Sequence, residues 1–134
     1  MGELNIVVLG DGLLGTEIVN QTNWPCLSRK KDNIDFTRPD TYFDSLLQHD
    51  IVLNCIACTD TYSKNKDIHW DINYKYVVQL ARFCKENNKK LIHISTDYVY
   101  ANSLGDSTED DVPIHAGNWY SYTKLLGDNA VHLE

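Results

Sequence analysis

The sequence predicts an α/β fold in which helices cover a doubly wound, mostly parallel sheet of about five strands. Short apolar runs rich in β-branched residues alternate with longer stretches of helical spacing, which is the pattern of strand–helix–strand units. A glycine-rich turn follows the first of these runs at residues 10–15. The runs lack polar alternation, as is typical of parallel strands covered on both faces and joined by right-handed crossovers.

The first half of the chain contains two clear elements and three weaker ones. Residues 4–9 predict a buried strand and residues 13–21 a helix, because the apolar run ends at glycine and helical spacing follows it. Residues 24–28 predict a short second strand, and residues 34–36 a marginal third strand. Residues 40–49 have helical spacing, and the proline before them suits a helix start.

The second half repeats the pattern with longer elements. Residues 51–57 and 90–95 predict two more strands, and residues 67–87 predict a long amphipathic helix between them. Residues 102–111 predict a polar loop, and residues 118–131 a final helix.

Length and charge narrow the range of partners. The 134 residues amount to one domain, and the net charge of -7 disfavours nucleic acid and anionic membranes as partners. No apolar run approaches the roughly 18 residues of a membrane span. The four cysteines are too few for a disulfide scaffold, so we expect a reduced, cytoplasmic protein.

The turn at residues 10–15 fits the dinucleotide-binding pattern G-x-G-x-x-G in the context that supports it, between a strand and a helix. Gly10 permits the tight turn, Gly12 lets the backbone approach a pyrophosphate, and Gly15 lets the helix pack on the strand. The helix start, with Leu13 and Leu14, then offers unpaired N–H groups to the anion. A glycine turn that only connects two elements is the alternative.

The end of the second predicted strand indicates which dinucleotide binds. The fingerprint expects an acidic residue there for the ribose 2′-hydroxyl, but Ser28, Arg29 and Lys30 occupy the place. Basic residues suit a 2′-phosphate, so we expect NADP(H) to be the preferred cofactor. Binding of NAD(H) stays possible. A solvated basic loop is the alternative interpretation.

A second set of residues can supply acid–base chemistry. Tyr120 and Lys124 are four apart in the final predicted helix, so they lie on one face, and the ammonium can stabilise the phenolate. Such a tyrosine can give a proton to a carbonyl oxygen. Ser95 and Thr96 follow a strand, where open parallel sheets bind ligands. Taken alone, Tyr120 and Lys124 also fit a tyrosine and a lysine on the surface of a helix. Ser95 and Thr96 also fit a turn at the end of a strand.

Together these motifs resemble the N-terminal half of the extended short-chain dehydrogenase/reductases, and most closely their dTDP-4-dehydrorhamnose reductase branch. The resemblance rests on residues 10–15, 35–36, 54–57, 93–100 and 118–125. The stretch S-T-D-Y-V-Y, followed by Y-x-x-x-K, is fairly specific to that branch. The superfamily's epimerases and dehydratases also have the glycine turn and the Tyr–Lys pair.

The resemblance implies roles for individual residues. Tyr120 is the implied proton donor, Lys124 holds the nicotinamide ribose and assists the tyrosine, and Thr96 positions the substrate carbonyl. Further implied positions are Asp35 and Phe36 at the adenine, Ala57 beneath the cofactor, and Asn73 as a structural polar residue.

Three residues depart from the family pattern. Cys55 and Ile56 stand where the family usually has small alanines, and Cys58 where the branch tends to have His or Tyr. The pattern Cys55-x-x-Cys58 is also found in redox and metal sites, but no second Cys/His pair accompanies it. We therefore expect ordinary reduced thiols and no metal site.

The resemblance also implies what the chain lacks. Residues 1–134 correspond to the dinucleotide-binding domain, and neither a sixth strand nor the C-terminal substrate domain follows. The last strand would then be an exposed sheet edge, which predicts a homodimer or another assembly that covers it. Three interpretations stay open: a small oxidoreductase acting on a sugar nucleotide, a non-catalytic NADP-binding or regulatory module, and a piece of a longer enzyme.

Overall fold

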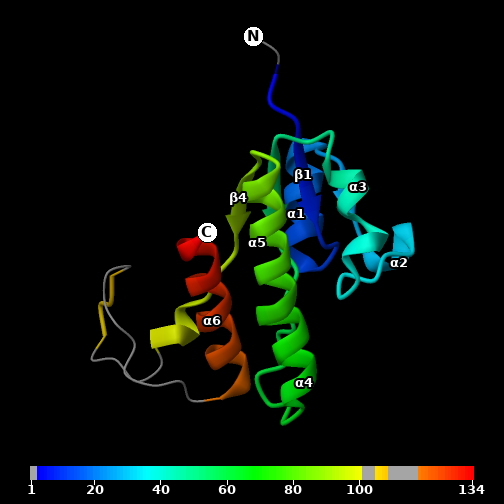
Figure 1. Ribbon diagram of the computed structural model, residues 1–134. Coiled ribbons are helices and arrows are strands. Elements are labelled where there is room, and N and C mark those ends of the chain that lie inside the picture. The colour runs from blue at the N-terminus through cyan, green and yellow to red at the C-terminus, as the bar shows by residue number, and fades with distance from the viewer. Residues whose placement is uncertain (1–2, 101–104, 109–117) are drawn as a thin grey trace.

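The structure of the chain, a computed structural model, describes residues 3–100, 105–108 and 118–134 (Figure 1). Its sheet is parallel, with the strand order β2-β1-β3-β4. The strands are β1 (Ile6–Leu9), β2 (Cys26–Leu27), β3 (Ile51–Asn54) and β4 (Lys90–His93). The chain moves from β1 to one side and then crosses to the other, as in a doubly wound sheet. The predicted fold class is confirmed.

One face of the sheet buries the main core. Val7, Leu9 and Val52 pack there against residues of α3 (Phe43–Leu46) and α5 (Tyr76–Glu86). The last helix, α6 (Trp119–Leu133), runs beside α5 on this face (Figure 1). This face therefore carries most of the buried apolar area that stabilises the fold.

The other face is covered unevenly. The strand register aligns Val8, Leu53 and Ile92 in one row, with exposed fractions of 0%, 8% and 41%. Right-handed crossovers place α1 (Leu13–Thr22) on this face, next to β1. The expected covering of both faces is thus met at β1 and β3, whereas β4 is open on this side.

The predicted long helix is confirmed, with an irregular middle. It consists of α4 (Lys66–His69), the π-helical segment η2 (Trp70–Lys75) and α5, and the Asn65 side chain caps its start. A Cβ at Gly127 of α6 would lie 2.4 Å from the carbonyl oxygen of Asn73 in η2. The two helices therefore meet backbone to backbone, which fixes α6 against the π segment.

The prediction of a strand at residues 34–36 is wrong, so the described part of the chain has four strands rather than about five. The Asp35 carboxylate accepts hydrogen bonds from the Thr37 N–H (3.0 Å) and hydroxyl (2.6 Å), which closes a turn instead. Ile34 and Phe36 on either side are buried in the main core.

Other boundaries differ in detail. The predicted helix at residues 40–49 is split into the 3-10 turn η1 (Pro39–Thr41) and α3, and the basic run forms the one-turn helix α2 (Arg29–Asp32). After β4, residues Asp97–Tyr100 form the 3-10 turn η3. The predicted loop at 102–111 lies outside the described residues except for 105–108. Within the described ranges, no helix is both long and apolar enough to cross a membrane.

Candidate active site

The turn between β1 and α1 requires glycine at two points. Gly10 has a φ of +101°, a conformation that L side chains rarely adopt. A Cβ at Gly15 would lie 2.0 Å from the carbonyl oxygen of Gly10, so α1 packs directly on the turn. At Gly12, by contrast, a Cβ would meet nothing within 4 Å. The backbone is therefore open to a ligand where the fingerprint places a pyrophosphate.

The start of α1 is suited to an anion. Gly12 is the N-cap, and no side chain in the described part of the chain caps the helix. The first N–H groups of a ten-residue helix then carry a partial positive charge without a side-chain acceptor. Leu13 and Leu14 flank this end, with exposed fractions of 96% and 45%, and line a shallow groove beside it.

A cleft of about 570 Å³ opens beside the glycine turn. Its walls come from this turn, from the segment after β2, from the loop after β3 and from α4 and η2 of the long helix. It brings together six of the predicted cofactor-binding residues: Gly10, Gly12, Arg29, Asp35, Phe36 and Ala57. The volume is in the range of small-molecule sites, and the open backbone at Gly12 fits a dinucleotide's diphosphate.

Ser28, Arg29 and Lys30, which the sequence places at the 2′ position of the cofactor, have different surroundings. Ser28 is buried, and its hydroxyl accepts a hydrogen bond from the Lys31 N–H (3.1 Å), so it caps α2. Arg29 and Lys30 are both exposed, but of the two only Arg29 lines the cleft. Arg29 is thus the member of the run that could meet a bound phosphate.

Acidic residues also line the cleft, namely Asp11, Asp35 and Asp71. Hydrogen bonds from Thr37 lower the pKa of Asp35, so this carboxylate stays ionised at neutral pH. An anionic ligand would therefore depend on the backbone N–H groups and on Arg29 rather than on a generally positive surface.

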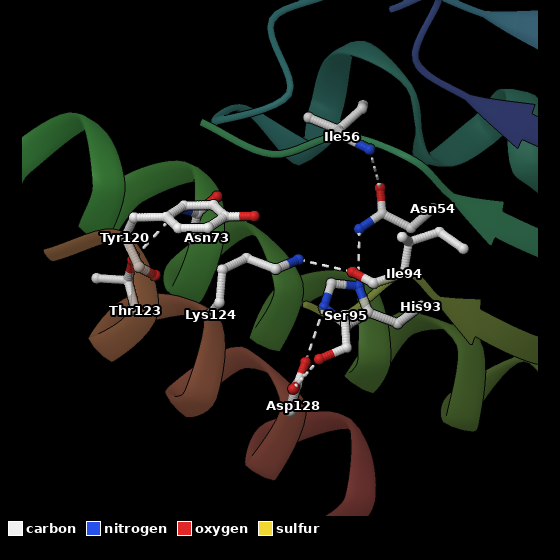
Figure 2. A network of polar contacts seen from close by, with 10 residues as sticks. All are labelled: Asn54, Ile56, Asn73, His93, Ile94, Ser95, Tyr120, Thr123, Lys124 and Asp128. Carbon is white, nitrogen blue, oxygen red and sulfur yellow. Dashed lines mark hydrogen bonds and ion pairs between the residues drawn. The ribbon is translucent and has the colours of Figure 1, made fainter. Parts of the chain in front are cut away.

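Tyr120 and Lys124 lie one turn apart on α6, and their side chains extend to the same side of the helix (Figure 2). Lys124 is 2% exposed, and its ammonium donates a hydrogen bond of 2.6 Å to the Ile94 carbonyl at the end of β4. Burial lowers the pKa of Lys124, and the charge of Asp128 opposes that effect. The amine is thus held at the carboxyl edge of the sheet, where parallel sheets bind ligands.

Aromatic rings surround the half-buried Tyr120. Its ring centroid is 5.5 Å from that of Tyr98 and 6.4 Å from that of His69. Thr96 precedes Tyr98 by two residues, and its hydroxyl accepts a hydrogen bond from the Tyr98 N–H (3.2 Å). Thr96 and Tyr120 are therefore linked through Tyr98, which the sequence analysis did not single out.

Asn73 connects η2 to the loop after β3. Its side chain is buried, accepts from the Cys58 N–H (2.8 Å) and donates to the Cys58 carbonyl (3.0 Å). It also donates to the hydroxyl of Thr123 on α6 (3.3 Å). Asn73 thus joins the cleft wall to the helix that carries Tyr120. These contacts are consistent with the structural role that the resemblance implies for Asn73.

Sequence analysis missed a buried polar group at the ends of β3 and β4. Asn54 and His93 are paired across these strands, and Asp128 on α6 lies next to His93 (Figure 2). Asn54 and His93 interrupt otherwise apolar runs, and Asp128 follows Lys124 by one helical turn. These spacings were the available signals.

The four cysteines, all of them among the described residues, form no disulfide with one another in the structure. All four are free, and burial raises the pKa of Cys26 and of Cys55. Cys55 and Cys58 line the cleft. Within the described residues, no group of three or more His, Cys, Asp or Glu side chains is arranged to hold a metal ion.

The fold and these residues place the chain in the class that its motifs resemble, the extended short-chain dehydrogenase/reductases. Residues 4–134 match the family described as RmlD substrate binding domain, and the chain belongs to this family. A dTDP-4-dehydrorhamnose reductase from Mycolicibacterium smegmatis is 31% identical over 134 residues, which cover 94% of this chain and 41% of that protein.

Solved structures have the same fold as this chain. A hypothetical dTDP-4-dehydrorhamnose reductase from Sulfolobus tokodaii superposes with a TM-score of 0.83 at 26% identity, over 95% of this chain and 51% of that one. A dTDP-4-dehydrorhamnose reductase from Bacillus anthracis in complex with NADP gives 0.81 at 23% identity, over 99% and 51%. The chain therefore spans about half the length of these relatives.

Proposed function

We propose that the chain is the cofactor-binding part of an NADP(H)-dependent oxidoreductase that reduces a keto sugar nucleotide. The observation that carries this proposal is the buried Lys124, one turn from Tyr120 on the edge of the sheet that also bears the glycine-turn cleft. The names of the relatives, which are reductases of a dehydro sugar nucleotide, support the substrate class.

The cleft residues divide the task of holding the cofactor. The N–H groups at Gly12 would bind the diphosphate, and Phe36 with Asp35 would flank the adenine. Arg29 would pair with the 2′-phosphate, which favours NADP(H), and Ala57 would let the cofactor pass close to the backbone. NAD(H) binding is the alternative outcome.

The chemistry of the chain's own residues is proton transfer and orientation. The bound nicotinamide would supply the hydride. Tyr120 would donate its hydroxyl proton to the carbonyl oxygen, and the Lys124 ammonium would stabilise the resulting phenolate. Thr96 would hold the same oxygen by a hydrogen bond. The four free thiols support a cytoplasmic location.

Turnover tests the catalytic part of the proposal. NADPH oxidation should be followed with a dTDP-4-keto-6-deoxy sugar as the substrate, and Tyr120→Phe should abolish it while NADPH binding persists. Tyr122→Phe, on the same helix but on its exposed side, is the matched control and should keep full activity. Tight NADPH binding without any turnover would instead favour a non-catalytic binding module, and turnover unaffected by Tyr120→Phe would overturn the assigned proton donor.

A further inference from the structure

A chain of polar contacts leads from the cleft to the neighbourhood of Lys124 (Figure 2). It starts at the cleft residue Ile56, whose N–H donates to the Asn54 side-chain oxygen (3.2 Å). The Tyr76 hydroxyl donates to the same oxygen (2.9 Å). Because a backbone N–H can only donate, these contacts fix which end of the Asn54 amide is the oxygen. The amide nitrogen must therefore face His93, at 3.1 Å from Nδ1.

This amide determines the tautomer of His93. Since the Asn54 nitrogen is a donor, Nδ1 of His93 accepts, and the proton of the neutral ring is on Nε2. Nε2 lies 3.5 Å from Oδ1 of Asp128, and the His93 side chain is only 4% exposed. By hydrogen-bond geometry, neither of these two atoms has a partner in the described residues. The buried Nε2 of His93 and this Asp128 oxygen are therefore close neighbours at ion-pair distance without a well-formed hydrogen bond.

The second oxygen of Asp128 accepts a hydrogen bond from the Ser95 hydroxyl. Between His93 and Ser95 lies Ile94, the residue whose carbonyl accepts from Lys124. Three consecutive residues at the end of β4 thus contact two side chains that are one turn apart on α6. Contacts at two points one turn apart fix both the position of α6 along its axis and its rotation about that axis, relative to the end of β4.

Charge adds a second effect to this geometry. A buried ammonium with one carbonyl acceptor loses hydration that one hydrogen bond does not replace. Asp128 supplies a negative charge nearby. Burial lowers the pKa of Lys124, and the charge of Asp128 partly offsets this by raising it. His93 and Ser95 in turn hold the carboxylate on the side of α6 that faces the strand end.

We propose that Asp128 is a positioning residue that stabilises the Lys124 ammonium and holds it at the end of β4, with His93, Asn54 and Ser95 fixing the carboxylate. The catalytic meaning of this role rests on the proposed function. The charge of Lys124 itself is measurable without cofactor or substrate, so the two ideas can fail separately.

The test is a pH titration of the whole chain labelled with ¹³Cε-lysine, followed by NMR, with the Lys124 signal assigned from its loss in Lys124→Met. Asp128→Asn should raise the acid dissociation constant of Lys124 about tenfold, which is one pKa unit. Asp128→Glu restores a carboxylate and should bring the constant back toward that of the unmodified chain. Glu134→Gln is the matched control, because it removes a charge from the same helix beside Arg82 and Lys85. It should leave Lys124 unchanged.

An unchanged Lys124 titration in a folded Asp128→Asn variant overturns the proposal. If circular dichroism shows that this variant does not fold, Asp128→Glu still decides the matter. A folded glutamate variant in which the Lys124 constant rises tenfold contradicts a role for the carboxylate charge. A chain that fails to bind NADPH but gives the expected Lys124 shifts disproves the proposed function and leaves the positioning role intact.

Discussion

The β1 side and the β4 side of the sheet's carboxyl edge keep their shapes by different means. On the β1 side the backbone sets the shape, because Gly15 leaves no room for a Cβ and Gly10 has a positive φ. On the β4 side, the side chains of His93, Asp128 and Lys124 set it through hydrogen bonds and charge. We therefore expect an added methyl group at Gly15 to disrupt the glycine turn as a whole. Substitutions on the β4 side should instead reduce stability by amounts that depend on how many hydrogen bonds and charges each one removes.

The largest effect is expected at Gly15. Gly15→Ala puts a Cβ against the Gly10 carbonyl, so the turn must open, at a cost of about 3 kcal/mol or more, and NADPH binding should be lost. Gly12→Ala is the matched control, because its Cβ meets open space. It should cost less than about 1 kcal/mol in stability while weakening NADPH binding about tenfold. Urea unfolding and calorimetry measure both quantities, and equal stability losses for the two variants would contradict the steric account.

The difference between the β1 side, shaped by a local backbone turn, and the β4 side, shaped by distant side chains, also explains what could be predicted from the sequence. The strands, the long helix and the glycine turn are local patterns, and the structure has them where the patterns indicate. The contacts of Asn54, His93 and Asp128 join residues far apart in sequence. Local spacing marks the three residues as unusual, but it does not show that they meet. The strand expected at residues 34–36 failed for a related reason, since the Asp35–Thr37 turn competes with a weak strand preference.

The next largest effect should be at Asn54, at the end of β3 beside His93. Asn54→Leu leaves the Tyr76 hydroxyl and the Ile56 N–H without their acceptor, which should lower the free energy of unfolding by about 2–3 kcal/mol. Tyr76→Phe removes a single hydrogen bond of this group and should cost about 1 kcal/mol. Chemical denaturation distinguishes them. Equal costs would show that the network is not held together through Asn54.

A smaller effect, confined to ligand binding, is expected at Arg29. Arg29→Ala should weaken NADPH binding about tenfold by removing a charge-assisted contact to the 2′-phosphate, and should leave NADH binding within twofold. Lys30→Ala removes the same charge one residue away, outside the cleft, and should change neither. Parallel titrations with both cofactors provide the measurement, and equal losses for NADPH and NADH would exclude the 2′-phosphate assignment.

The smallest effect on stability is expected at the open edge of the sheet. Ile92 is 41% exposed on β4, so Ile92→Lys should change the free energy of unfolding by less than about 0.5 kcal/mol. If a second copy covers this edge, the same substitution should shift a dimer toward monomer in sedimentation velocity. Glu3→Gln, at the exposed start of the chain, makes the same change of one unit in net charge and serves as the charge control. A chain that is monomeric at micromolar concentration before any substitution would rule out the predicted homodimer.

The central claim is that the glycine turn and its cleft bind NADP(H), and calorimetric titration of the chain with NADPH and NADH tests it most directly. The account predicts that both cofactors bind, NADPH at least tenfold more tightly than NADH. It also predicts that the Gly12→Ala variant binds NADPH more weakly than the unmodified chain does. Absence of binding by either cofactor would contradict it, because the turn would then have only an architectural role in joining β1 to α1.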